Sequence, residues 1–306
     1  MLGEAELGEV MKPKELKIQV NGRTLAGLEF GSAQAPVTIL ACHGWLDNAA
    51  SFALLAPRLG DVRLIAFDLP GHGRSEWRAP GDWYAIWDYV LDLHAALDLL
   101  ELDRVHLLGH SLGAGILSML AAVLPERVGS LVMLEGLGPL TQSPAEARLQ
   151  MVKALEWRLA PPKAPSLYQD LDRMVRARTF GRFPVSEAAA RLLVSRGVVR
   201  EEGGYCWSHD PRLLAPSVAR LTEAEVKSFF EQIAQPVLVC LADGGIATPE
   251  SMRRLDWLKD VRLVEIKGGH HPHLEEDTLA AVVDTIATFY RSMEKTEFRE
   301  KAEICD

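Results

Sequence analysis

The chain has 306 residues, of which 48% are hydrophobic and 25% are charged, proportions typical of a globular protein. Its net charge of -9 at pH 7 argues against nucleic acid as a partner, because nucleic-acid binding requires clustered Lys and Arg. No apolar stretch approaches the roughly 18 residues that suggest a membrane span, and the acidic stretch 1–10 lacks the basic-then-apolar pattern of a signal peptide. We therefore predict a cytoplasmic protein with no membrane or nucleic-acid partner.

The first predicted elements, in chain order, form a hairpin over residues 16–20 and 24–30 around Asn21-Gly22, a dipeptide typical of tight β-turns. Short continuous apolar runs follow and predict buried strands at 37–42, 62–67, 105–108, 131–134, 237–241 and 261–266. Helical patterns over 83–100, 112–124 and 278–293 alternate with these runs. Because such alternation places helices on both faces of a parallel sheet, we predict an α/β fold.

The alternation breaks between residues 139 and 235, where helical patterns and aromatic residues occur without a convincing central strand. No linker-like composition divides the chain, so we interpret residues 139–235 as a helical cap inserted into one core domain, residues 1–138 and 236–306. The aromatic residues of the cap either line a pocket or form the cap's own small core: Trp157, Tyr168, Phe180, Phe183, Tyr205 and Trp207. Trp157 and Phe183 are the candidates for substrate binding.

Four arginines of the cap, Arg173, Arg176, Arg178 and Arg182, allow two interpretations. They form either a site for a carboxylate or phosphate group or a solvated helix face. The spacing alone leaves both open, and the solvated face is the simpler of the two.

Neither the cysteines nor the histidines have the spacing of a metal site. Cys42 and Cys240 fall inside predicted strands, which favours buried free thiols over a disulfide framework. Three histidines gather in Gly268-Gly269-His270-His271-Pro272-His273, but they lack the i, i+4 spacing of a helical zinc site, and no second ligand cluster accompanies them. We predict no metal and no cofactor.

The stretch Gly109-His110-Ser111-Leu112-Gly113 lies between the strand 105–108 and the helix 112–124. Strand, G-x-S-x-G and helix is the context of a nucleophile elbow, in which flanking glycines allow a tight turn that exposes the serine hydroxyl. Ser111 is therefore the predicted nucleophile. His110, inside the elbow, is expected to orient the turn and to border the substrate site.

A serine nucleophile needs a general base and an acid that orients it. His270 follows the last predicted strand and two glycines, at the same sheet edge as Ser111, and is the predicted base, with His271 next. Two acids are candidates. Asp243 follows the strand 237–241, and Glu135 ends the strand 131–134, where a carboxylate requires a partner to offset its desolvation.

An oxyanion hole needs two backbone N–H groups aimed at the developing negative charge. Leu112, directly after the nucleophile, supplies the first. The loop after the strand 37–42 reads His43-Gly44-Trp45, and Trp45 is expected to supply the second, with its indole at the floor or mouth of the pocket.

Four motifs in this order resemble the α/β-hydrolase fold family, specifically its lidded branch of epoxide hydrolases, haloalkane dehalogenases, C–C bond hydrolases and serine hydrolase-like proteins. The resemblance covers about residues 15–293. It implies a mostly parallel eight-stranded sheet with a cap inserted after the sixth strand. The motifs are His43-Gly44-Trp45, Asp68-Leu69-Pro70-Gly71-His72-Gly73-Arg74-Ser75, Gly109-His110-Ser111-Leu112-Gly113 and Gly269-His270.

The resemblance also bears on the acid. Relatives with an acid after the seventh core strand usually carry it further beyond the strand's proline than Asp243 lies here, and a glycine, Gly245, stands at that position. This is similar to the subgroup whose acid follows strand six, which favours Glu135 and keeps Asp243 as the alternative.

The nucleophile type indicates the reaction. Dehalogenases and epoxide hydrolases of the family use an aspartate, so Ser111 implies attack on an acyl carbon. We expect a serine carboxylesterase that cleaves small-molecule esters of short to medium acyl groups through an acyl-enzyme. The alternatives are a C–C bond hydrolase or cofactor-free perhydrolase with the same triad, and a small-molecule receptor with a vestigial triad. The sequence does not indicate an oligomeric state.

Overall fold

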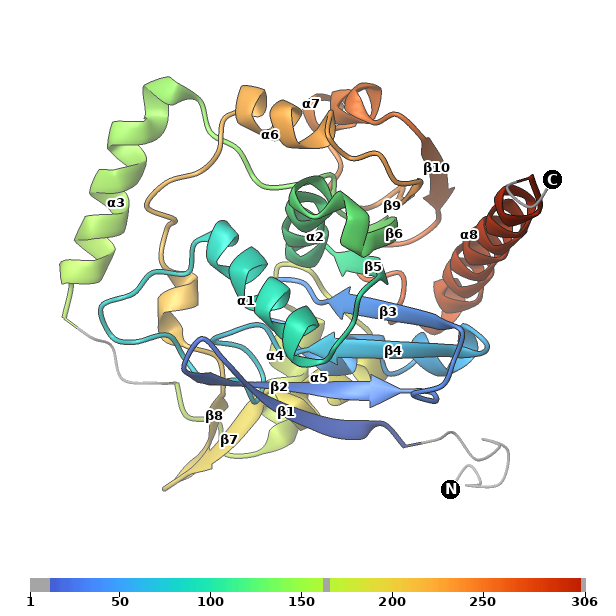
Figure 1. The fold of residues 1–306 in the computed structure, drawn as a ribbon. Coiled ribbons are helices and arrows are strands. Elements are labelled where there is room, and N and C mark those ends of the chain that lie inside the picture. The colour runs from blue at the N-terminus through green and yellow to red at the C-terminus, as the bar shows by residue number, and fades with distance from the viewer. Residues whose placement is uncertain (1–11, 162–165, 304–306) are drawn as a thin grey trace.

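The computed structural model describes residues 12–161 and 166–303, so the acidic stretch 1–10 lies outside the described residues. Its centre is an eight-stranded sheet in the order β1-β2-β4-β3-β5-β6-β9-β10 (Figure 1). Strand β2 is antiparallel to β1 and β4, and the other neighbours are parallel, which confirms the predicted sheet. The strands are β1 (Lys14–Val20), β2 (Arg23–Phe30), β3 (Val37–Cys42), β4 (Val62–Phe67), β5 (Val105–His110), β6 (Val128–Leu134), β9 (Val237–Ala242) and β10 (Val261–Ile266).

Helices cover both faces of the sheet. Helices α1 (Ile86–Leu99), α2 (Leu112–Val123) and α6 (Glu223–Phe230) share one buried cluster with Leu40 and Cys42 of β3. Helix α8 (Glu276–Glu303) packs on the other face with Ile39 and Ala41. Because successive side chains of a strand point to opposite faces, a strand buried on both sides must be apolar throughout, as 37–42 is.

Two local predictions are confirmed. Asn21 and Gly22 have φ of 48° and 76°, the left-handed backbone that a two-residue hairpin turn requires, and they join β1 to β2. Cys42 and Cys240 are buried free thiols in β3 and β9.

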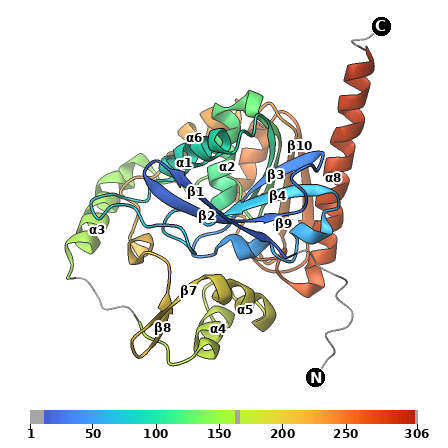
Figure 2. The same ribbon diagram turned by 60° about the horizontal axis from the view of Figure 1, so that its bottom comes forward.

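The segment between β6 and β9 contains helices α3 (Ala147–Leu159), α4 (Leu171–Thr179) and α5 (Glu187–Arg196) before α6. It also contains a hairpin of β7 (Val198–Glu201) and β8 (Gly204–Trp207), which the sequence analysis did not predict and which forms a sheet separate from the central one. Aromatic side chains from β8 pack on a small buried cluster of α4 and α5, so they belong to the cap's own core. Figure 2 shows α4, α5, β7 and β8 together on one side of the sheet.

Helix α6 lies within the range 139–235 but packs on the core. Its Val226 and Phe230 are fully buried in the cluster that α2 shares with the sheet. The short helix α7 (Pro249–Met252) follows β9. The last part of the inserted range therefore extends the helical layer of the core.

Buried ion pairs join the cap to the core. One of these pairs joins Nε of Arg196, at the end of α5, to Oδ2 of Asp68 at a distance of 2.8 Å. The two side chains are 3% and 0% exposed. Asp68 also accepts the N–H groups of Ala49 and Arg74, and it thereby connects the loop after β3 with the loop after β4. A buried carboxylate is stable here because three groups donate to it, the N–H groups of Ala49 and Arg74 and Nε of Arg196.

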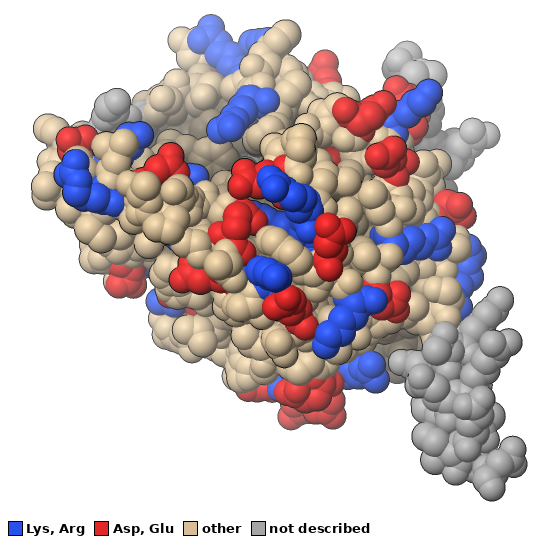
Figure 3. All heavy atoms as spheres, turned by 90° about the horizontal axis from the view of Figure 1, so that it is seen from above, with Lys and Arg blue, Asp and Glu red and all other residues tan. Residues whose placement is uncertain are grey.

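On the face seen in Figure 3, acidic and basic side chains are interspersed, with no field of one sign across it. Within residues 12–161 and 166–303, no helix is both long and apolar enough to span a lipid bilayer.

The contact of α2 with β3 at Gly113 yields a first prediction. A Cβ on Gly113 would overlap the carbonyl oxygen of Cys42, and backbone atoms on both sides leave little room to move. We expect Gly113→Ala to lower the free energy of unfolding by about 3 kcal/mol, at the upper end of overpacking effects. Urea denaturation measures it. Gly81→Ala is the matched control because a Cβ there meets no atom within 4 Å; equal losses in both variants would contradict the packing argument.

Candidate active site

Ser111 stands at the turn between β5 and α2. Its φ is 51°, in the left-handed region that non-glycine residues rarely adopt, and its N–H donates to the carbonyl of Leu134 at 2.9 Å. A Cβ on Gly109 would approach the backbone of Ala114 to 2.5 Å. The glycines on either side therefore let the helix begin directly at the strand end, and the strained turn presents the Ser111 hydroxyl.

Three predicted residues from distant parts of the chain form one hydrogen-bonded series. The Ser111 Oγ lies 3.0 Å from Nε2 of His270, and Nδ1 of His270 lies 3.2 Å from Oε2 of Glu135. Ser111 follows β5, Glu135 follows β6, and His270 lies in the loop between β10 and α8. His270 is 6% exposed and Glu135 is fully buried, so water competes little for these bonds.

Hydrogen bonds with backbone groups hold both the main chain and the carboxylate of Glu135. Its own N–H donates to the carbonyl of Cys240 at 2.9 Å, and its φ is 48°. Its carboxylate accepts the N–H groups of Ala242 and, at 3.1 Å, Ile246. A Cβ on Gly245 would overlap this carboxylate. Gly245 stands where an acid after strand seven would lie. Because it has no side chain, it leaves space for Glu135, which follows β6.

The structure does not bring Asp243 together with His270. Asp243 is exposed, and its Oδ1 accepts the N–H of Gly268 at 2.9 Å. Its backbone N–H donates to the carbonyl of Ile266 at 3.0 Å. Asp243 thus fixes the beginning of the loop that carries His270.

The two N–H groups predicted for an oxyanion hole, those of Trp45 and Leu112, donate to no acceptor among the described residues. Leu46, with φ of 62°, and the hydrogen bond from Asp47 N–H to the carbonyl of Gly44 at 3.1 Å shape the turn after β3. The Trp45 indole is 41% exposed and donates to the carbonyl of Leu213 in the cap at 3.0 Å. The indole therefore attaches the cap to this loop.

The three other predicted substrate-binding residues lie in different places. The Phe183 ring covers His270, with centroids 4.3 Å apart. Trp157 is 36% exposed on α3, which lies at the edge of the molecule in Figures 1 and 2, and its ring contacts no other aromatic ring among the described residues. His110 is fully buried, and its Nε2 donates to the carbonyl of His270 at 2.8 Å. The expectation that His110 borders the substrate is therefore corrected: burial limits it to holding the loop of His270.

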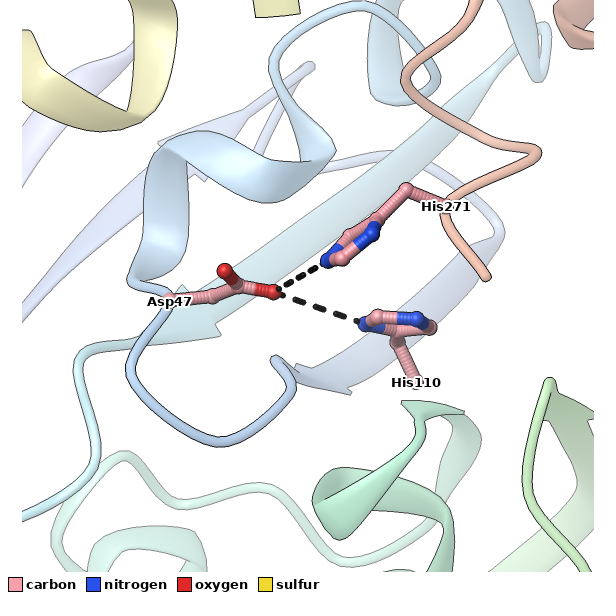
Figure 4. A group of neighbouring side chains, drawn as sticks. All are labelled: Asp47, His110 and His271. Atoms are coloured by element: carbon pink, nitrogen blue, oxygen red, sulfur yellow. Dashed lines mark hydrogen bonds and ion pairs between the residues drawn. The ribbon is translucent and has the colours of Figure 1, made fainter. Parts of the chain in front are cut away.

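Asp47 is a functional candidate that the sequence interpretation missed. Its Oδ2 lies 3.1 Å from Nε2 of His271 and 3.7 Å from Nδ1 of His110 (Figure 4). These three atoms lie within 4.8 Å of one another, close enough to hold a metal ion. The other oxygen of the same carboxylate, however, accepts from Arg178 of α4. A guanidinium beside the carboxylate already supplies the positive charge that a metal would bring.

The contact with Asp47 also shows whether either of the two interpretations of the cap arginines applies to Arg178. Its side chain is 18% exposed and paired with Asp47, so it belongs neither to a solvated face nor to an empty anion site. The signal for Asp47 was an acidic residue two positions after Trp45, in the loop of the predicted oxyanion hole. Its partners lie 131 and 224 residues away, so no local pattern could identify them.

The sequence matches the family described as alpha/beta hydrolase fold over residues 37–277. The chain belongs to this family. This confirms the resemblance that the four ordered motifs indicated.

Serine hydrolase-like proteins are among its relatives. A serine hydrolase-like protein of Danio rerio is 27% identical, with 92% of this chain and 90% of that protein covered. A probable serine hydrolase of Drosophila melanogaster is 31% identical, with coverage of 85% and 83%. The crystal structure of a hypothetical protein from Pseudomonas aeruginosa PAO1 superposes with a TM-score of 0.85 at 38% identity, covering 91% of this chain and 99% of that one. A thioesterase domain from the curacin biosynthetic pathway shares the fold, with a TM-score of 0.80 at 22% identity over 90% of this chain and 99% of that one.

Buried neutral histidines predict a pH-dependent stability. Burial lowers the pKa of His209 to about 4 and that of His273 to about 3. It also lowers the pKa values of His43, His72 and His110. In the unfolded chain a histidine titrates near about 6.5, so below that pH unfolding takes up protons and the free energy of unfolding falls.

Each such histidine contributes up to about 1.4 kcal/mol per pH unit between its unfolded and folded pKa values. We therefore expect urea midpoints to fall steeply between pH 6.5 and pH 4.5. In His209→Gln one proton fewer is taken up on unfolding. The slope of unfolding free energy against pH should therefore be smaller by about 1.4 kcal/mol per pH unit over that range. An unchanged slope would show that His209 protonates in the folded state.

A further prediction concerns Gly245. We expect Gly245→Ala to push the Glu135 carboxylate away from His270, because its Cβ needs the space that the carboxylate fills. The low-field proton signal of the Nδ1–H of His270, bonded to a carboxylate in the wild type, should then shift upfield or broaden in proton NMR. Gly269→Ala is the control, since a Cβ there meets no atom within 4 Å. The same low-field signal in wild type and Gly245→Ala would rule out this steric coupling.

Proposed function

We propose that the protein is a serine hydrolase that cleaves carboxylic esters of small molecules through an acyl-enzyme. The observation that carries the proposal is the series of hydrogen bonds from Ser111 through His270 to Glu135, at 3.0 and 3.2 Å. An acceptor carboxylate fixes the imidazole tautomer whose free Nε2 can take a proton from serine. This arrangement supports acyl transfer, because it places a base with a fixed tautomer beside the serine hydroxyl.

In the proposed reaction, Ser111 Oγ attacks the ester carbonyl carbon while His270 takes the hydroxyl proton. The N–H groups of Trp45 and Leu112, which lack acceptors among the described residues, stabilise the negative oxygen of the tetrahedral intermediate. His270 then gives its proton to the alcohol, which leaves. Water, deprotonated by His270, attacks the acyl-enzyme and releases the acid. The sequence of steps requires no metal and no cofactor.

The surroundings of the base favour apolar acyl groups. The Phe183 ring lies against His270 at an interplanar angle of 40°, and the half-exposed Trp45 lies on the loop of the proposed oxyanion hole. Aromatic side chains at this position exclude water and contact apolar substrate. Because the cap covers the core on this side, we propose short to medium acyl chains. Thioesters undergo the same acyl transfer, and a thioesterase domain is among the structural neighbours.

The proposal is tested with a series of p-nitrophenyl esters of increasing chain length in stopped-flow experiments. Wild type is expected to release a burst of p-nitrophenol equal to the enzyme concentration, because acylation by an activated ester is faster than hydrolysis of the acyl-enzyme. Ser111→Ala should lose the burst and turnover. Glu135→Gln should lower kcat by about 10³-fold or more, since the neutral amide favours the unproductive imidazole tautomer.

Asp243→Asn is the matched control for Glu135→Gln, because Asp243 carries a carboxylate one strand away and bonds Gly268 instead of His270. Because the amide oxygen of Asn can still accept the N–H of Gly268 and so hold the loop, we expect the kcat of Asp243→Asn to stay near that of wild type. A burst that survives in Ser111→Ala would contradict the nucleophile. Absence of turnover with every ester would contradict the substrate class and favour C–C bond cleavage, perhydrolysis or ligand binding alone.

A further inference from the structure

Three side chains connect the cap to the loop that carries His270. Oδ1 of Asp47 accepts from Arg178 of helix α4, and Oδ2 of Asp47 lies 3.1 Å from Nε2 of His271. The carboxylate can only accept, so His271 donates its Nε2–H. Figure 4 shows Asp47 and His271 pointing toward each other, with His110 beside them. His271 is the residue next to the proposed base.

The centre of this connection is inaccessible to water. The side chains of Asp47 and His271 are 1% and 4% exposed, and that of Arg178 is 18% exposed. Burial raises the pKa of the Asp47 carboxyl, but Arg178 and His271 outweigh it and hold that pKa well below its usual range. The carboxylate is therefore charged and depends on these donors, and a buried charge that loses a partner is strongly unfavourable.

Three residues of the loop that carries His270 form hydrogen bonds with buried side chains of the core. The carbonyl of His270 accepts from Nε2 of His110 at 2.8 Å. His271 donates to Asp47, and Nε2 of His273 lies 2.9 Å from the hydroxyl of Ser51. The ring of His270 itself is free of these bonds and reaches Ser111 and Glu135. A change in the position of Asp47 would therefore move the backbone from which the base projects.

Asp47 also bears on the proposed oxyanion hole. It lies two residues after Trp45, and its N–H closes the turn by donating to the carbonyl of Gly44 at 3.1 Å. A Cβ on Gly44 would lie 2.8 Å from Nδ1 of His110 and 3.1 Å from Oδ2 of Asp47. The turn that presents the Trp45 N–H thus packs directly on the Asp47 side chain.

We propose that Asp47 is a positioning residue which, through Arg178, couples docking of the cap to assembly of both the His270 loop and the oxyanion turn. The inference rests on the proposed function, since it concerns the same serine centre. Arg178 binds the carboxylate only while α4 lies against the core. Loss of that partner leaves an uncompensated buried charge next to both catalytic loops, and the reacting groups lose their alignment.

The test uses a fluorophosphonate, which reports on Ser111, the base and the oxyanion hole without depending on the natural substrate. The Ser111 Oγ–P bond forms, the P–F bond breaks with loss of fluoride, and the serine proton passes to His270. The saturating rate constant reports alignment of the reacting groups, and the half-saturating concentration reports binding. Wild type, Asp47→Asn, Arg178→Gln and the double variant are compared.

Both single variants are expected to lower the saturating rate constant about tenfold or more, because small displacements of reacting groups have large effects. The double variant should lose no more than the worse single variant, since it leaves no unpaired buried charge. Trp77→Phe is the control for cap attachment alone: it removes a hydrogen bond from Trp77 to the carbonyl of Ser208 in the cap, and Trp77 is 48% exposed. It should change only the half-saturating concentration.

The outcomes separate this inference from the proposed function. If wild type is not labelled at all, the proposed function fails. If wild type is labelled and Arg178→Gln changes only the half-saturating concentration, as Trp77→Phe does, Arg178 is a simple tether and the coupling is overturned. Additive losses in the double variant overturn it as well. Should Asp47→Asn not fold, as judged by circular dichroism, Arg178→Gln decides alone, since its side chain lies at the margin of the core.

Discussion

The close approach of helix α2 to strands β3 and β5 is the constraint on which the rest of the site depends. Without side chains at Gly109 and Gly113, the helix begins at the strand end, and Ser111 is held at φ of 51° with its hydroxyl exposed. Because the neighbouring strands β4, β3, β5, β6, β9 and β10 are parallel, every loop that follows one of them opens at this same edge. The other reactive groups need only short loops to reach the serine.

The tandem His270-His271 divides two tasks between neighbouring residues. One imidazole lies against Glu135, and the next lies against Asp47, so each histidine has its own buried carboxylate. The first pair orients the ring that faces Ser111. The second pair fixes the backbone from which that ring projects. Two buried carboxylates near one loop are tolerated because backbone N–H groups or Arg178 supply further donors to each.

Two buried or half-buried ion pairs connect the cap to the core. Arg178 and Arg196 bring two guanidinium groups from α4 and α5 to Asp47 and Asp68, both of which lie on loops beside the strand ends. Such pairs are specific in geometry and lose most of their value when separated. In the arrangement that these pairs stabilise, Phe183 covers His270.

The sequence by itself determined the fold and indicated the candidate nucleophile and base, because each has a local signature: apolar runs that alternate with helical periods, a glycine-flanked serine between strand and helix, and a histidine after two glycines beyond the last strand. It left Glu135 and Asp243 as alternatives, since both end apolar strands. Tertiary structure decided their placement, because Gly245 leaves space for one carboxylate and Gly268 binds the other. It also brought Asp47, Arg178 and His271 together, which no local pattern encodes, because a buried ion pair depends on which distant loops meet after the chain has folded.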